Sequence, residues 1–240
     1  MLEDYIIISI VIIILSIVQS VFGIGILIFG TPILLLFGFD FFPALSFLLP
    51  ASFIISLLQV FTSWDQKPVI SKYLYIWCLP AIALSLWITD LTSWSHYLIG
   101  GILIASAVTR INQRVQNWLA SALRKNDALY HVLMGIVHGS TNLGGALLTI
   151  FAVTIHHEKK AIRYVVAYYY LLFSLVQFFV LAVVVKFPAL FSYNLLTALL
   201  AVFIFKSIGN RIFIQAKDNT YQKALSIFIF ACGLAIILNF

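Results

Sequence analysis

Two clusters of neutral polar residues and glycine interrupt otherwise apolar stretches of this sequence. The first cluster is Gln19, Ser20, Gly23, Gly25, Gly30 and Thr31, and the second is His138, Gly139, Ser140, Thr141, Asn142, Gly144, Gly145 and Thr149. Glycine lets a backbone turn sharply or approach a ligand closely. A helix that breaks at such a point creates a new N-terminus, whose N–H groups bind anions. The clusters therefore predict a site for a small anion that receives no full charge from the protein.

Close packing of helices is the alternative role for these residues, because small side chains let membrane helices approach one another. Gly135-xxx-Gly139 has the spacing of such a contact. Gln59 and Gln177 are also interpreted as structural residues, whose side chains form hydrogen bonds between helices. We expect the following residues to line the substrate site: Gln19, Ser20, Gly23, Gly25, Thr31, His138, Ser140, Thr141, Asn142, Gly144 and Gly145.

The charged residues exclude several classes of function. All eight acidic residues lie at or beyond the ends of apolar runs, so no carboxylate is expected at membrane depth. Carriers of cations commonly depend on an intramembrane Asp or Glu, which argues against a sodium, calcium or heavy-metal carrier. No nucleophile–base pair, phosphate loop or specific metal motif is present, so we expect neither an enzyme nor a cofactor or metal. The stretch His156-His157-Glu158 favours an interfacial loop over a metal site.

Other conspicuous residues favour structural roles. His131 lies near a run end, and Cys78 and Cys232 lie inside apolar runs as buried thiols. Arg110 and Arg163 are interpreted as topology anchors, with contact to substrate at the cytoplasmic mouth as the alternative.

The composition indicates a membrane protein. The chain has 240 residues, of which 63% are hydrophobic and 9% charged. Soluble domains are about 45–50% apolar and about 25% charged. The formal net charge of +6 does not indicate a nucleic-acid partner, because the basic residues lie at the ends of apolar runs, where they set topology. The expected partners are the lipid bilayer and a small anionic substrate.

The apolar runs give an expected architecture. A membrane span needs roughly 20 apolar residues. Six runs have about the length of one crossing, whereas 5–39 and 128–155 are too long and are predicted to be broken helices or re-entrant hairpins. The expected first repeat, 1–112, has the hairpin 5–39 and helices 43–62, 73–89 and 96–109. A cytoplasmic linker, 113–127, follows. The second repeat, 128–240, has the hairpin 128–155 and helices 164–185, 190–205 and 224–238.

Charge supports an inverted repeat. If the hairpin 5–39 begins and ends outside and the hairpin 128–155 begins and ends inside, every basic residue except Lys186 lies in the cytoplasm, as lysine and arginine prefer. Three crossings then follow each hairpin, so the second half is inserted upside down and both termini lie outside. The sequence repeats weakly: Val18–Gly25 aligns with Val137–Gly144, and Gln59 with Gln177. We predict an all-α integral membrane fold of two inverted-topology repeats.

Three stretches carry a family resemblance. Gly23-Ile24-Gly25 is followed by Pro32, Asn142-Leu143-Gly144-Gly145-Ala146 is followed by Phe151, and a later stretch reads Ser207-Ile208-Gly209-Asn210-Arg211. The chain resembles the TauE/SafE family of anion exporters, which is linked to sulfite and organosulfonates and carries two Gly-x-Gly-Gly-Gly-like motifs, each followed by a proline. Ile26 and Leu27 depart from the first motif, and Phe151 stands where the second has proline. The resemblance implies that Gly23, Gly25, Asn142, Gly144 and Gly145 lie at the substrate site.

These observations predict a transporter of the inner or plasma membrane that exports a small sulfur oxyanion or organosulfonate by alternating access. A passive channel for a small solute and a non-transporting membrane scaffold or assembly factor are the alternatives.

Overall fold

The computed structural model describes residues 2–66, 68–90, 125–184, 191–218, 220 and 221, and the isolated positions 114, 115, 118 and 121. All regular structure in these residues is helical. The predicted helices 96–109 and 224–238 lie outside the described residues, as does most of the predicted linker 113–127.

The first half of the chain has a divided hairpin followed by two long helices. Helix α1 (Leu2–Phe22) and helix α2 (Ile26–Leu36) replace the single run 5–39, and Gly23, with a φ of 80°, makes the turn between them. Helix α3 (Phe41–Thr62) follows, with a short 3-10 turn, η1, at Trp64–Gln66. A π-helical turn, η2 (Leu74–Cys78), leads into α4 (Leu79–Asp90).

The second half follows the same order. Helix α7 (Asp127–Thr141) and helix α8 (Gly145–Ile155) divide the second long run. Asn142 ends α7 in the left-handed conformation, with a φ of 63°. Helix α9 (Lys159–Val184) comes next, and then α10 (Phe191–Ile204), the π-helical turn η3 (Phe205–Gly209) and α11 (Asn210–Gln215).

Two helices are longer than the apolar runs that predicted them. Helix α9 begins at Lys159 rather than at residue 164, and α10, η3 and α11 continue to Gln215 rather than ending at residue 205. Lysine and arginine end an apolar run, but they are good helix formers and do not end a helix. In addition, Lys159 Nζ donates to the carbonyl oxygens of Phe213, Ile214 and Ala216 at the end of α11.

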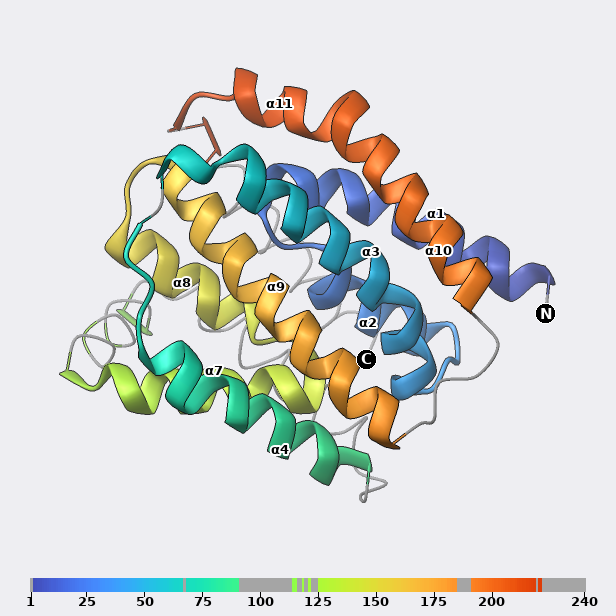
Figure 1. Ribbon diagram of the computed structural model, residues 1–240, viewed down its shortest axis with the longest axis horizontal. Coiled ribbons are helices and arrows are strands. Elements are labelled where there is room, and N and C mark those ends of the chain that lie inside the picture. The colour runs from blue at the N-terminus through green and yellow to red at the C-terminus, as the bar shows by residue number, and fades with distance from the viewer. Residues whose placement is uncertain are drawn as a thin grey trace.

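An antiparallel pair, α3 and α9, forms the centre of the bundle (Figure 1). Helix α10 packs on α3 and α4 packs on α9. Helix α1 contacts α10, η3 and α11, while α7 contacts η2 and α4. Helices α2 and α8 lie on α3 and α9 respectively. The last described helices of each half therefore pack on the first helix of the other half.

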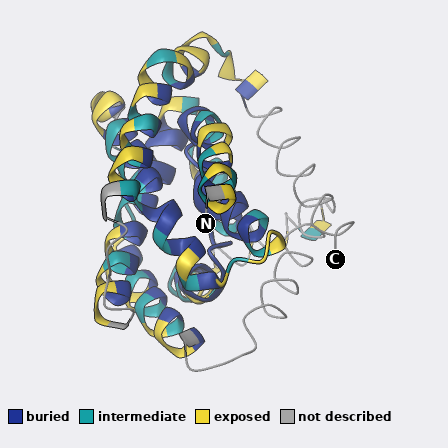
Figure 2. Cartoon of the chain, turned by 90° about the vertical axis from the view of Figure 1, so that its right-hand side faces the viewer, coloured by how far each residue is buried: buried dark blue, intermediate teal, exposed yellow. Residues whose placement is uncertain are grey.

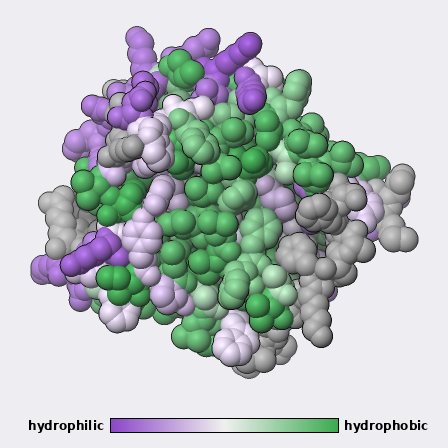
Figure 3. Space-filling model, in the orientation of Figure 1, coloured by the Kyte–Doolittle hydropathy of each residue, from purple (hydrophilic) through white to green (hydrophobic). Residues whose placement is uncertain are grey.

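The surface is suited to a bilayer. Among the described residues, four helices are long and apolar enough to cross a membrane: Glu3–Phe22, Phe41–Thr62, Lys159–Val183 and Tyr193–Gln215. Exposed apolar residues on these helices include Ile14, Phe61, Phe179 and Phe203. Figure 2 shows exposed residues along the outward-facing sides of the helices. Figure 3 shows hydrophilic residues gathered mainly toward the end where α3 and α11 finish, with apolar surface across the middle. The chain is a multi-pass helical membrane protein.

Candidate functional site

The first helix break is closed by a side chain of the protein. Gln19 is fully buried near the end of α1, and its Oε1 accepts from the backbone N–H of Ile26, the first residue of α2, at 3.0 Å. Its Nε2 donates to Ser52 O at 2.9 Å and approaches the hydroxyls of Ser52 and Ser56 at 3.1 and 3.2 Å. The Gln19 amide therefore occupies the place where a ligand would meet the N-terminus of α2.

Gln59 completes this first cluster. Its Nε2 donates to the backbone oxygens of Gln19 at 2.6 Å and Ser20 at 3.1 Å, two carbonyls in the last turn of α1. The Ser20 hydroxyl donates to the Ser16 carbonyl in its own helix. The expected site residues Gln19, Ser20, Gly23 and Gly25 thus lie together, and the two polar side chains among them have protein partners.

The second break is joined to the first half through Asn142. Asn142 Nδ2 donates to Thr31 Oγ1 of α2 at 2.8 Å, and Gln177 Nε2 of α9 donates to Asn142 Oδ1 at 2.6 Å. All three residues are fully buried. Thr31, although it belongs to the first half, is therefore part of the second cluster with His138, Asn142, Gly144 and Gly145. No direct hydrogen bond between the two turns themselves is found in the described part of the chain.

Several polar atoms around the second break have no hydrogen-bond partner among the described residues. They are the Tyr170 hydroxyl, the Ser174 hydroxyl, Gln177 Oε1 and both ring nitrogens of His138, although the side chains of His138 and Gln177 lie close enough to interact with each other. Each of these side chains is fully buried. An unsatisfied buried polar group costs about 1–3 kcal/mol, and native proteins rarely leave several together. Such a group is expected where a ligand supplies the missing partner.

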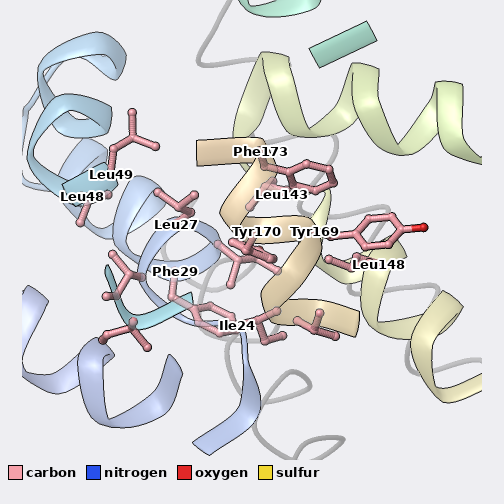
Figure 4. Packing of buried hydrophobic residues seen from close by; sticks show 14 of the residues in the cluster. Ile24, Leu27, Phe29, Leu48, Leu49, Leu143, Leu148, Tyr169, Tyr170 and Phe173 are labelled. Atoms are coloured by element: carbon pink, nitrogen blue, oxygen red, sulfur yellow. The ribbon is translucent and has the colours of Figure 1, made fainter. Parts of the chain in front are cut away.

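Tyr170 lies directly against the start of α8. A Cβ built on Gly145 would collide with the Tyr170 hydroxyl, so only glycine lets the first residue of α8 approach it this closely. The His138 ring lies 5.6 Å from the Tyr170 ring and 4.4 Å from the Phe173 ring, measured between centroids. Figure 4 shows Tyr170 and Phe173 in the same packed cluster as Leu143, from the turn between α7 and α8, and Leu27 of α2. The unpartnered hydroxyl thus lies at a helix N-terminus inside an apolar shell.

Tyr170, Ser174 and Gln177 share one face of α9, because their spacing of four and three residues is helical. A corresponding face on α3 carries Ser52, Ser56 and Gln59 at the same spacing. The sequence analysis missed Ser52, Ser56, Tyr170 and Ser174 as site residues. The signal that could have found Ser56 and Ser174 is Ser56-Leu57-Leu58-Gln59-Val60-Phe61, which is similar to Ser174-Leu175-Val176-Gln177-Phe178-Phe179.

Other predicted residues have local roles in the structure. The Ser140 and Thr141 hydroxyls donate to the carbonyls of Ile136 and Val137, one turn earlier in α7. Gly135 and Gly139 pack α7 against η2 and α4, where added Cβ atoms would strike Cys78 O and Ser85 Oγ.

His131 connects helices near the start of α7. Its Nδ1 lies 3.0 Å from Asp127 Oδ1, and its Nε2 lies 2.8 Å from the Tyr169 hydroxyl. Cys78 is buried, as expected. No group of three or more His, Cys, Asp or Glu side chains that could hold a metal occurs in the described residues.

The described residues form a multi-pass helical bundle with two broken helices and a buried polar cluster. The chain belongs to the sulfite exporter TauE/SafE family, since a model of that family matches residues 8–236, nearly its whole length. Neither the curated proteins nor the solved structures contain a significant match to the chain. Membership makes the chain a membrane transporter in a family of sulfite exporters.

Proposed function

We propose that the chain exports a small sulfur oxyanion, with sulfite as the first candidate, and that it binds the anion at the second helix break. The observation that carries this proposal is the set of buried, unpartnered groups on His138, Tyr170 and Ser174 beside the start of α8. Hydroxyl and imidazole N–H groups donate hydrogen bonds to an oxyanion, and the N-terminus of α8 adds a partial positive charge. The apolar shell strengthens these interactions because it excludes water.

The first break indicates how a ligand fits the second. Gln19 aligns with His138, and Ser52, Ser56 and Gln59 align with Tyr170, Ser174 and Gln177. In the first half, the Gln19 amide bridges the two serines and the first amide of α2. His138 makes no corresponding bridge to the described residues of the second half. An anion in that place would accept from the same kinds of group that hold the Gln19 amide.

The proposed inverted repeats would support a mechanism of alternating access. Helices α3 and α9 are antiparallel, carry matching polar faces and lie at the centre of the bundle (Figure 1). The exchange of contacts between halves, α1 with α10–α11 and α7 with α4, is what two repeats of opposite orientation would produce. We propose that one repeat rocks against the other around the anion, as in other inverted-repeat transporters.

The proposed location is the inner or plasma membrane, with both termini outside. The ends of α3 and α11 and the start of α9 lie together through the contacts of Arg163 and Lys159, and this end carries the basic residues that favour the cytoplasm. A membrane potential that is negative inside favours loss of an anion by about 2.3 kcal/mol per charge per 100 mV. Export then needs no dedicated acidic group at membrane depth.

Anion-dependent thermal stability tests this proposal. Detergent-purified protein is heated with sulfite, thiosulfate, sulfoacetate or taurine, and the experiment is repeated with His138→Ala and Ser174→Ala. We expect at least one sulfur oxyanion to raise the Tm of the wild type and to have little effect on either variant. Ser140→Ala is the matched control, because the Ser140 hydroxyl already bonds within α7. No stabilisation by any of these anions would contradict the proposal.

A further inference from the structure

Arg163 is a buried cation in the first turns of α9. Its side chain is 2% exposed. Nη1 donates to Asn210 Oδ1 at 3.0 Å and weakly to the Ser20 carbonyl at 3.4 Å. Nη2 donates to Ser63 Oγ at 3.1 Å and weakly to Thr62 Oγ1 at 3.5 Å. The guanidinium carbon lies 3.4 Å from the centre of the Phe213 ring. All of these partners are neutral.

The charge of Arg163 has no ionic partner in the described part of the chain. No described carboxylate forms an ion pair with it, and its Nε–H has no hydrogen-bond acceptor there. Buried charges in proteins are normally paired, because an isolated buried ion is costly. The ends of α1 and α3 lie close by, and a helix C-terminus carries only a partial negative charge. The helix ends alone therefore leave the Nε–H edge of the guanidinium unused.

We infer that Arg163 forms a second oxyanion site, at the cytoplasmic end of the transport path. This inference rests on the proposed function. A guanidinium binds the oxygens of an oxyanion through two parallel N–H groups. Here that edge consists of the free Nε–H and of Nη2, whose weak contact with Thr62 Oγ1 at 3.5 Å an anion would replace. The Ser63 hydroxyl beside Nη2 can donate its own hydrogen to the same anion.

The site also gives a role to the stretch Ser207–Arg211, which the helix-break cluster does not include. Asn210 from this stretch orients the guanidinium through Nη1. Gly209 lets η3 approach α1 so closely that a Cβ there would collide with Ser20. Lys159 Nζ lies 5.0 Å from the centre of the same Phe213 ring that Arg163 covers. Two cations therefore lie beside one aromatic ring, which makes this end of α9 attractive to anions.

Arg163 lies on the face of α9 that leads to the helix-break cluster. It precedes Tyr170 by seven residues, which is about two turns and about 10 Å along the helix axis. Tyr170, Ser174 and Gln177 continue the same line toward the other end of α9. An anion captured at Arg163 would thus meet the unpartnered groups of the second cluster next along the helix.

Equilibrium dialysis of ³⁵S-sulfite against the purified full chain tests this assignment. We expect two sulfite ions per chain at saturation for the wild type and one for Arg163→Gln. Tyr170→Phe should still bind two, but one of them roughly 10- to 150-fold more weakly. Arg163→Lys should keep the second site with about tenfold weaker binding, because one hydrogen bond to the anion is lost. Ser63→Ala should weaken the same site and serves as the second probe if Arg163→Gln does not fold.

The outcomes separate this inference from the proposed function. One site in the wild type that Tyr170→Phe weakens and Arg163→Gln leaves intact would overturn the role of Arg163 and support the helix-break site. Sulfite binding that Arg163→Gln abolishes entirely while Tyr170→Phe leaves it unchanged would support the Arg163 site and contradict the helix-break site. No binding of sulfite to the wild type would contradict both.

Discussion

Tyr170→Phe is expected to stabilise the protein while weakening its binding of anions. The substitution removes one oxygen atom and leaves the aromatic ring in place. Tyr170 is fully buried, and its hydroxyl has no hydrogen-bond partner among the described residues. In the anion-free protein the hydroxyl therefore lowers the free energy of unfolding, whereas in the anion-bound protein it donates a hydrogen bond to the anion. The two effects of the substitution should have opposite signs.

The magnitudes follow from the cost and gain of one hydrogen bond. An unsatisfied buried polar group costs about 1–3 kcal/mol, so the free energy of unfolding should rise by up to that amount. For a chain of this length, each kcal/mol raises the Tm by about 2–4 °C. A hydrogen bond to a charged group contributes about 1.5–3 kcal/mol. Its loss should raise the Kd for sulfite roughly 10- to 150-fold.

Thermal unfolding with and without sulfite measures both effects, and Tyr169→Phe is the matched control. The Tyr169 hydroxyl lies 2.8 Å from His131 Nε2, so its removal leaves a buried nitrogen unpaired. Tyr169→Phe should therefore lower the Tm by several degrees and leave the Kd for sulfite unchanged. The reasoning is refuted if Tyr170→Phe lowers the Tm as Tyr169→Phe does and keeps wild-type affinity.

Three further predictions concern the second turn, the topology and the connection between α8 and α9. Asn142 has a φ of 63°, so Asn142→Gly should keep the turn and lose only the hydrogen bonds to Thr31 and Gln177, whereas Asn142→Ala should be less stable by about a further 1 kcal/mol because of backbone strain. Chemical unfolding of the two variants measures this difference, and equal stability would contradict the prediction. In a background without native cysteines, Asp40→Cys should react with an impermeant maleimide from outside intact cells and Lys217→Cys should react only after lysis; the reverse pattern would invert the proposed topology. Burial, together with the charge of His157, lowers the pKa of His156 below its ordinary 6.5. The contribution of His156 to folding stability is therefore complete above pH 6.5 and is lost as the pH falls. His156→Gln should make the Tm less sensitive to acid, and an unchanged dependence of the Tm on pH would show that His156 does not contribute.

The helical membrane fold could be predicted from the sequence because the bilayer imposes it directly. Apolar runs of limited length and basic residues at their ends follow from the thickness and charge asymmetry of the membrane. Helix ends were less predictable. Lys159 extends α9 because its ammonium group finds carbonyl oxygens at the end of α11, a contact between residues more than fifty positions apart.

The sequence predicted part of the candidate site. Glycine and asparagine at the breaks mark backbone turns, a local property that sequence carries. Whether a buried polar side chain has a hydrogen-bond partner depends on the other helices that pack against it. Gln19 hydrogen-bonds to Ser52 and Ser56 of α3, whereas His138 makes no hydrogen bond to the corresponding Tyr170 and Ser174 of α9. Tyr170 resembles its neighbours Tyr168 and Tyr169 in sequence, and only packing shows that its hydroxyl faces Gly145.

Counterflow of sulfite in proteoliposomes tests the central claim most directly. Vesicles that contain the purified full chain are loaded with unlabelled sulfite and diluted into a trace of ³⁵S-sulfite. A carrier with a binding site at the second helix break should accumulate label transiently, saturate with external sulfite and lose this behaviour in Ser174→Ala but not in Ser140→Ala. Label that only equilibrates would indicate a channel, and no sulfite-dependent uptake at all would contradict the account.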